Sequence, residues 1–131
     1  MALDPTNLPA DVLAFLGDYH LATLTTQRPD GSPHVVPVGF GYDQQSGLAR
    51  IITFAPSKKA RNLLAAPGSR AVVCQVDGGR WLALEGPASV TDDPARVAAA
   101  VDAYAARYRT PGERADRVAI EIRVDRILGH A

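Results

Sequence analysis

The strictest constraint on the fold is a run of alternating side chains near the C-terminus. Within Arg117–Ile127, branched apolar residues occupy every second position: Val118, Ile120, Ile122 and Val124. A period of two separates side chains onto the two faces of an extended strand, with one face buried and the other in water. This segment therefore predicts a strand that contributes one face to a hydrophobic core.

Five more strands are predicted from segments rich in apolar or β-branched residues and bounded by turn residues. They are Tyr19–Thr26, Ser32–Tyr42, Leu48–Phe54, Arg70–Val76 and Arg80–Val90. Several connections are short turns, which favour antiparallel pairing of neighbouring strands. Before the second strand, Pro29 presets φ and Gly31 can take a positive φ, as a tight turn requires.

Three helices are predicted between these strands. One covers Pro9–Leu16, one covers Ser57–Ala65 with Ser57 as its N-cap, and one follows Asp93 and runs to about Tyr108. Six antiparallel strands in a short chain favour a barrel, because closure removes exposed sheet edges. We therefore predict one mainly β (α+β) domain over residues 1–131, a six-stranded antiparallel barrel with flanking helices.

Composition excludes several classes of function. The formal net charge is zero, whereas a nucleic-acid-binding protein is expected to carry excess Lys and Arg. No segment reaches the roughly 18 apolar residues of a membrane helix. Cys74 is the single cysteine, which suits a reducing cytoplasm, and the three histidines match no metal-binding spacing. We expect a cytoplasmic protein with no metal site and no membrane or nucleic-acid partner.

The first turn of the helix after Ser57 contains an unexpected group of cations. Lys58, Lys59 and Arg61 lie at the end of the helix where the partial charge is positive, so these cations are disfavoured there. Free backbone N–H groups at this end bind anions, and the cations make sense if the anion is a phosphate. The alternative is an ordinary solvated basic helix.

Two weaker features involve planar or flexible residues. The segment Gln75–Trp81 contains a turn flanked by a glutamine, an arginine and the single tryptophan. The arginine and tryptophan can stack on a ring system, or the tryptophan can simply anchor a core. In the second predicted strand, Pro37 and Gly39 interrupt an apolar run. A glycine there lets a planar ligand approach the backbone, although a bulged barrel strand has the same pattern.

Taken in order, these segments resemble the pyridoxamine 5'-phosphate oxidase-like split β-barrels. Within that superfamily they are most similar to the F420-dependent reductase branch, near its biliverdin reductase group. The resemblance rests on seven segments: His20–Thr26, Ser32–Phe40, Ser57–Asn62, Cys74–Trp81, Leu84–Gly86, Arg107–Pro111 and Val118–Val124.

The resemblance implies a homodimer with cofactors bound between the two barrels. The implied cofactor is coenzyme F420, with FMN as the alternative. The implied phosphate-binding residues are Ser57, Lys59, Arg61 and Asn62, with Lys58 nearby. The implied wall of the tricyclic ring runs from Val36 to Phe40 and includes Pro37, Val38 and Gly39. The residues expected to reach the cofactor, from the same or the partner chain, are Gln75, Arg80 and Trp81.

The function implied is reduction of a small conjugated acceptor, such as a bilin or an enone, by hydride transfer from reduced F420. Two alternatives remain open at this point. One is an FMN-dependent oxidoreductase of the same fold, and the other is a non-catalytic carrier of a cofactor or tetrapyrrole. No residue stands out as a catalytic acid or base.

Overall fold

The computed structural model describes residues 2–131, and within that range the sheet has nine strands, not the six predicted. The strands are β1 Ala2–Leu3, β2 Ala22–Gln27, β3 Pro33–Val38, β4 Gly41–Asp43, β5 Leu48–Phe54, β6 Arg70–Asp77, β7 Arg80–Thr91, β8 Arg117–Arg123 and β9 Arg126–His130. Two extra strands arise where predicted strands divide, and the third is the short β1. The predicted class, an antiparallel sheet with flanking helices, is confirmed.

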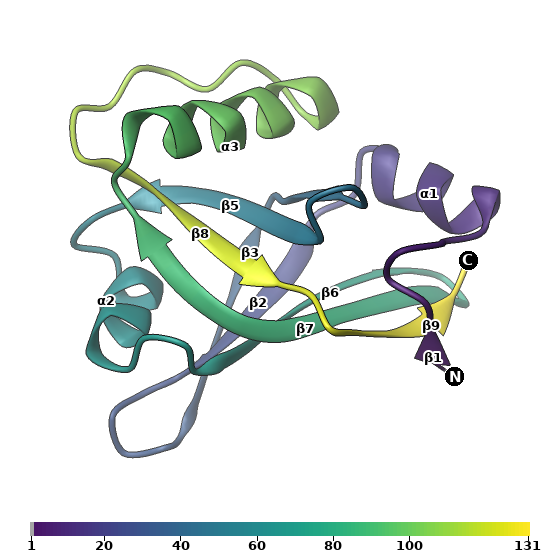
Figure 1. The fold of residues 1–131 in the computed structure, drawn as a ribbon, viewed down its shortest axis with the longest axis horizontal. Coiled ribbons are helices and arrows are strands. Elements are labelled where there is room, and N and C mark those ends of the chain that lie inside the picture. The colour runs from purple at the N-terminus through teal and green to yellow at the C-terminus, as the bar shows by residue number, and fades with distance from the viewer. Residues whose placement is uncertain (1) are drawn as a thin grey trace.

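Three helices lie outside the sheet in the described part of the chain: α1 Ala10–Gly17, α2 Lys58–Ala65 and α3 Pro94–Arg107. Figure 1 shows α3 across β5 and β8, α2 at one end of the sheet, and α1 at the other end near both termini. The helices agree closely with the predicted segments. In α2 and α3, Ser57 and Asp93 act as N-caps through their side-chain oxygens, as predicted.

The sheet is antiparallel throughout and follows the order β3-β2-β6-β7-β8-β5-β4. Strand β7 is the central element, because its first half pairs with β9 and its second half with β8. The change of partner occurs at Gly86, where a Cβ atom would lie 1.9 Å from the carbonyl oxygen of Arg123. A side chain at position 86 would therefore prevent β7 and β8 from crossing this closely.

The two divided strands explain most of the error in the strand count. The predicted strand Ser32–Tyr42 divides at Gly39 and Phe40, because Tyr104 of α3 and Tyr108, which follows α3, pack against Gly39. The predicted strand Arg117–Ile127 divides after Arg123, where Val124 N–H donates to Gly47 O and Asp125 N–H donates to Glu85 O. The alternation of apolar residues continues through the break between β8 and β9, so the local sequence gave no sign of this break.

The core lies between the two halves of the curved sheet and under α1. Its fully buried members include Phe15, Leu24, Phe40, Ile51, Val73, Leu82, Leu84, Ile120, Ile122 and Ile127. Ile120 and Ile122 confirm the predicted buried face of β8, but the prediction that its other face lies in water is wrong: Ala119 and Glu121 are 0% and 6% exposed, because α3 packs against β8. No helix within residues 2–131 combines the length and apolar character needed to cross a bilayer.

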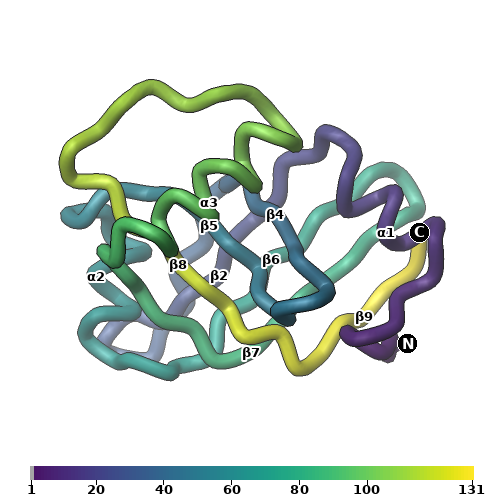
Figure 2. Tube along the Cα trace, turned by 45° about the horizontal axis from the view of Figure 1, so that its top comes forward, coloured from purple at the N-terminus to yellow at the C-terminus, as the bar shows by residue number. Residues whose placement is uncertain are grey.

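The connection from α3 to β8 covers residues 108 to 116. Figure 2 shows it returning alongside α3 before it enters β8, so that it runs beside the sheet end that carries α2. The backbone N–H of Ala55, which follows β5, donates to Asp116 O at 2.9 Å and fixes the end of this connection. The connection therefore lies close to the segment between β5 and α2.

Candidate functional site

The start of α2 is joined to the end of β5 by a pair of buried hydroxyl groups. Ser57 Oγ accepts the backbone N–H of Ala60 at 3.3 Å and the hydroxyl of Thr53 at 3.0 Å. Ser57 is only 6% exposed. The cap thus has a structural role, and it fixes where the basic first turn of α2 sits relative to β5.

The basic first turn of α2 does not point its side chains in one direction. Lys59 faces a cleft, Lys58 is half-buried on the side of His34, and Arg61 is exposed outside the cleft. Asn62 is 2% exposed and donates to the Thr26 hydroxyl at 3.1 Å, which ties α2 to β2. Of the four residues predicted to hold a phosphate, and Lys58 nearby, only Lys59 lines the cleft of this protomer.

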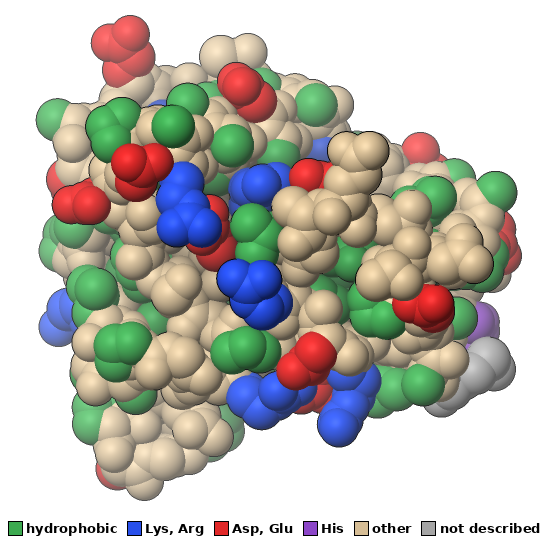
Figure 3. All heavy atoms as spheres, in the orientation of Figure 1, with side chains coloured by type: hydrophobic (Ala, Val, Ile, Leu, Met, Phe, Trp, Pro, Cys, Tyr) green, Lys and Arg blue, Asp and Glu red, His purple; other side chains and the backbone are tan. Residues whose placement is uncertain are grey.

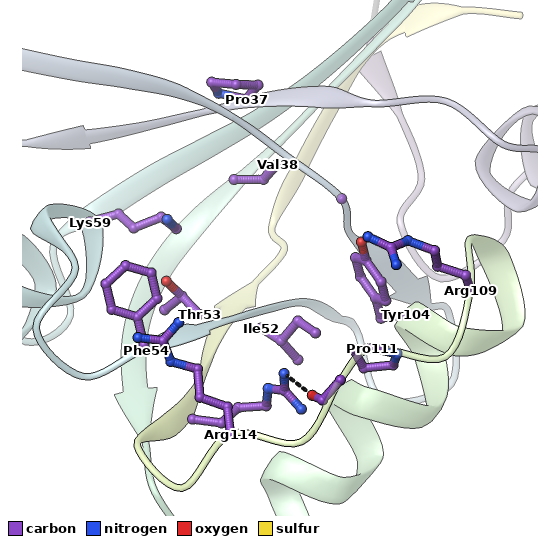
Figure 4. A pocket seen from close by; sticks show the side chains of 13 residues that line it. Pro37, Val38, Ile52, Thr53, Phe54, Lys59, Tyr104, Arg109, Pro111 and Arg114 are labelled. Carbon is purple, nitrogen blue, oxygen red and sulfur yellow. Dashed lines mark hydrogen bonds between the residues drawn. The ribbon is translucent and has the colours of Figure 1, made fainter.

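The cleft has a volume of about 320 Å³ and lies between β3, β5, α2, α3 and the α3–β8 connection. Figure 4 shows Lys59 at one side and Tyr104 with Arg109 at the other. The lining consists of Pro37, Val38, Gly39, Ile52, Thr53, Phe54, Lys59, Tyr104, Arg109, Pro111, Gly112, Arg114 and Arg117. Four of these residues are cationic and none is acidic, so the cleft suits an anionic ligand with an apolar part.

Lys59 is the cation in the most unusual environment. Its side chain is half-buried, and burial lowers the pKa of its ammonium group. Within residues 2–131 it forms no ion pair, and the ring of Phe54, whose centroid lies 5.9 Å from Nζ, is the neighbouring π system. A partly desolvated charge without a counter-charge is costly, and a bound anion would remove that cost.

Three arginines from the α3–β8 connection and β8 complete the basic lining. The guanidinium of Arg114 lies 4.0 Å from the Phe54 ring centroid and pairs with Asp116. Arg117 donates to Gly112 O at 2.6 Å. The sequence predicted no ligand-binding role for these three arginines, although the density of arginines between positions 107 and 117 was a usable signal.

Half of the cations outside the cleft form ion pairs, namely Arg50, Arg70, Arg80, Arg96 and Arg126. Figure 3 shows basic and acidic side chains intermingled on the face where β7 and β8 cross. Arg70 binds Glu85 at 3.1 Å and Asp125 at 2.6 Å, and Arg96 lies 3.4 Å from Glu121. Exposed pairs of this kind contribute little to stability, but they neutralise the surface, and Lys59 has no such neutralising partner.

The predicted ring-binding segment of β3 lies partly in the cleft. Pro37, Val38 and Gly39 line it, whereas Val36 packs against the core. A Cβ on Gly39 would lie 2.8 Å from a Tyr104 ring carbon and 2.9 Å from a Tyr108 ring carbon. Tyr104 and Tyr108 of the same chain therefore occupy the side-chain position of Gly39, while its backbone lines the cleft.

Gln75, Arg80 and Trp81 lie outside the cleft of their own protomer. Gln75 is fully buried, donates to Phe15 O at 3.0 Å and accepts from Arg107 at 2.8 Å. Arg80 stacks on Phe15 at 4.4 Å and pairs with Asp77, and Trp81 contacts His130 edge-on. Both ends of the Gln75 amide are thus engaged within the chain.

The cleft offers few groups that can transfer a proton, namely the ammonium group of Lys59 and the hydroxyl of Tyr104. Among the described residues its lining contains no Asp, Glu, His or Cys. Across the same residues no group of three His, Cys, Asp or Glu side chains gathers as a metal site would require. The cleft can therefore bind and orient an anionic, partly apolar ligand, and a reaction there would depend on chemistry that the ligand brings.

Comparisons with known proteins agree with this geometry. The chain is 52% identical over 126 residues to an F420H(2)-dependent biliverdin reductase of Mycobacterium tuberculosis (strain CDC 1551 / Oshkosh), covering 96% of this chain and 90% of that protein. A solved structure described as an F420 reductase has 26% identity and a TM-score of 0.70, covering 92% of this chain and 98% of that chain.

The fold is also shared with the conserved hypothetical protein Rv2991 of Mycobacterium tuberculosis. That structure has 24% identity and a TM-score of 0.78, and the match covers 95% of this chain and 84% of that one. The family described as pyridoxamine 5'-phosphate oxidase matches residues 8–131, which is nearly the whole chain. The chain therefore belongs to the pyridoxamine 5'-phosphate oxidase family.

Proposed function

We propose that this protein is an F420H2-dependent reductase that acts on a conjugated small molecule such as biliverdin. The observation that carries the proposal is Lys59, a half-buried ammonium group that faces a basic cleft and has no counter-charge within residues 2–131. A phosphate would supply that counter-charge. The 52% identical F420H(2)-dependent biliverdin reductase supports F420 as the phosphorylated cofactor and a bilin as the acceptor.

The residues of the cleft fit a phosphorylated ring cofactor. Lys59 would bind the phosphate, while Pro37, Val38 and Gly39 would lie along one face of the ring system. Lys58 and Arg61 would add positive potential at the same end of α2, and Ser57 and Asn62 would hold that helix in place. When bound, reduced F420 supplies a hydride, which carries two electrons and one proton.

The protein's own contribution is to bind, orient and shield. Ile52, Phe54 and Pro111 provide apolar walls that exclude water from part of the cleft. Reduction of the acceptor requires one further proton besides the hydride. Because the described lining has no carboxylate or imidazole and Lys59 is assigned to the phosphate, we propose that solvent delivers this proton.

We further propose a cytoplasmic homodimer that is formed through one face of the sheet. This outer sheet face comprises Thr23, Thr25, Val35, Pro37, Val72, Cys74, Val76, Trp81 and Ala83, which share a face according to the strand register. These nine residues are uncharged, and Val35 and Val76 are 55% and 66% exposed. Beyond Val72 the same face continues into Glu85 and Arg70, which pair with each other. An apolar patch of this kind marks an interaction surface.

Continuity with the cleft favours a second copy of the chain as the occupant of this face. Pro37 belongs to the outer sheet face and also lines the cleft. A partner on this face would therefore complete the open side of the cleft. In that arrangement Trp81 and Arg80 would approach the partner's cofactor, not the one in their own cleft. The free thiol of Cys74 on the same face is consistent with a reducing compartment.

A turnover assay tests the proposed activity. Reduced F420 and reduced FMN are each mixed with the protein and with biliverdin or a cyclic enone, and cofactor oxidation and acceptor loss are followed by absorbance. We expect oxidation of F420H2 in step with acceptor loss, in a ratio of one to one. Turnover with FMN alone would replace F420 in the proposal, and tight binding without turnover would make the protein a carrier.

A further inference from the structure

The cleft contains a second cation that is free to bind a ligand, Arg109. Within the described residues its guanidinium forms no ion pair, whereas Arg114 pairs with Asp116 and Arg117 donates to Gly112 O. Figure 4 shows Arg109 beside Tyr104, across the cleft from Lys59, with Val38 and Ile52 between them in the view. The two free cations therefore lie at opposite ends of one apolar floor.

Arg109 is also held near this position by its neighbours in the chain. Arg107, two residues earlier, is 8% exposed and donates to Asp18 O, Phe40 O and the Gln75 amide oxygen, each at 2.8 Å. The hydroxyl of Tyr108 donates to His20 O at 2.7 Å. The backbone that precedes Arg109 is thus anchored, so binding through this residue costs little backbone entropy, and its exposed side chain lines the cleft.

A single phosphate group cannot engage both ends of this cleft at once. With Lys59 assigned to the phosphate of the cofactor, the exposed guanidinium of Arg109 is available to a separate anionic group. A guanidinium binds carboxylates through two parallel hydrogen bonds, which gives both affinity and orientation. The nearby ring of Tyr104 offers a flat apolar surface for the conjugated part of the same ligand.

We propose that Arg109 binds a carboxylate of the acceptor and so selects conjugated substrates that carry acidic side chains. The assignment rests on the proposed function, in which Lys59 binds the cofactor. Arg109 is then left to bind the acceptor. Arg109 positions the substrate and takes no part in proton transfer, because a guanidinium stays protonated.

Equilibrium binding of biliverdin and of its dimethyl ester, without cofactor, tests this assignment. The two ligands share the conjugated system and differ in their carboxylates. Titrations use the wild type, Arg109→Gln, Arg109→Lys and the control Arg123→Gln, which removes one exposed charge outside the cleft. Parallel titrations with F420 report on the Lys59 end.

We expect Arg109→Gln to weaken biliverdin binding about tenfold, the loss of one charge-assisted contact. Binding of the ester and of F420 should change less than about twofold, Arg109→Lys should recover part of the loss, and Arg123→Gln should resemble the wild type. In turnover assays Arg109→Gln should raise KM for biliverdin with little change in kcat.

Three results would overturn the assignment: equal effects of Arg109→Gln on acid and ester, no effect on either, or a wild type that binds neither. Failure of the proposed function has a different signature. If the wild type binds biliverdin through Arg109 but F420H2 is not oxidised, the reductase proposal fails while the carboxylate site stands.

Discussion

The hydroxyl of Thr53 in β5 donates to the hydroxyl of Ser57, the N-cap of α2, at 3.0 Å. Both side chains are buried, so this contact is shielded from water. It connects the strand that forms the cleft floor to the helix that supplies Lys59. The position of the proposed phosphate-binding lysine is thereby set by the sheet and not by α2 alone.

Replacing Ser57 should therefore destabilise the protein. Ser57→Ala removes a cap and leaves the Thr53 hydroxyl without its acceptor, and we expect a loss of about 1–2 kcal/mol in the free energy of unfolding. Urea unfolding followed by circular dichroism measures it. Ser89→Ala, an exposed serine in β7, is the control and should change stability by less than about 0.5 kcal/mol. Equal stabilities would show that the cap contributes little.

Loss of the charge on Lys59 should weaken cofactor binding. Lys59→Gln keeps a polar side chain of similar reach but removes the counter-charge for a phosphate, and we expect F420 affinity to fall at least about tenfold. Fluorescence titration of F420 measures the change, with Arg123→Gln as a charge-matched control. Unchanged affinity in Lys59→Gln would remove Lys59 from the cofactor site.

The pH dependence of F420 binding should carry the signature of Lys59. Burial lowers the pKa of its ammonium group, and only the protonated form attracts phosphate. Affinity should therefore fall as pH rises through that lowered pKa. In Lys59→Arg the guanidinium remains protonated, so the fall attributable to this side chain should vanish. Superimposable pH profiles for wild type and Lys59→Arg would contradict the assignment.

Gly39 should tolerate no side chain. Gly39→Ala places a methyl group within 3 Å of the rings of Tyr104 and Tyr108, and Tyr108 is tethered by its hydroxyl to His20 O and Phe40 N–H. We expect a destabilisation of about 1–3 kcal/mol, typical of overpacking. Gly17→Ala, which meets nothing within 4 Å, should not be destabilised. Thermal unfolding distinguishes the two variants, and equal melting temperatures would contradict the close contact.

Charges placed on the outer sheet face should dissociate the proposed dimer. The double variant Val35→Lys, Val76→Lys adds two cations to the uncharged part of this face, and we expect sedimentation equilibrium to shift from dimer toward monomer. The matched control is Leu13→Lys, Leu64→Lys, which alters two exposed leucines on α1 and α2. An identical oligomeric state in the two double variants would place any interface elsewhere.

Local sequence patterns predicted most elements of the fold. Ser57 and Asp93 mark helix starts because capping is a short-range interaction. The alternation from Val118 to Val124 predicted a strand and its core face, but not the burial of Ala119 and Glu121 on the other face. The break between β8 and β9 depends instead on bonds to Gly47 and Glu85, which are distant in sequence. No local pattern encodes such contacts.

The candidate site was predicted in part for a similar reason. Lys59 stood out because a cation is disfavoured in the first turn of a helix. Arg109 did not, because its role depends on the α3–β8 connection lying beside β5 and α2. Gln75 and Val76 are neighbours in β6, yet one is fully buried and the other exposed, and the strand's orientation could not be fixed from the motif alone.

A crystal structure of the protein with F420 bound tests the central claim most directly. We predict phosphate oxygens within about 3 Å of Lys59 Nζ, a charge-assisted hydrogen bond, with the ring system against Pro37, Val38 and Gly39. A cofactor bound at another surface, with the Lys59 ammonium group left in water, would contradict the proposed site.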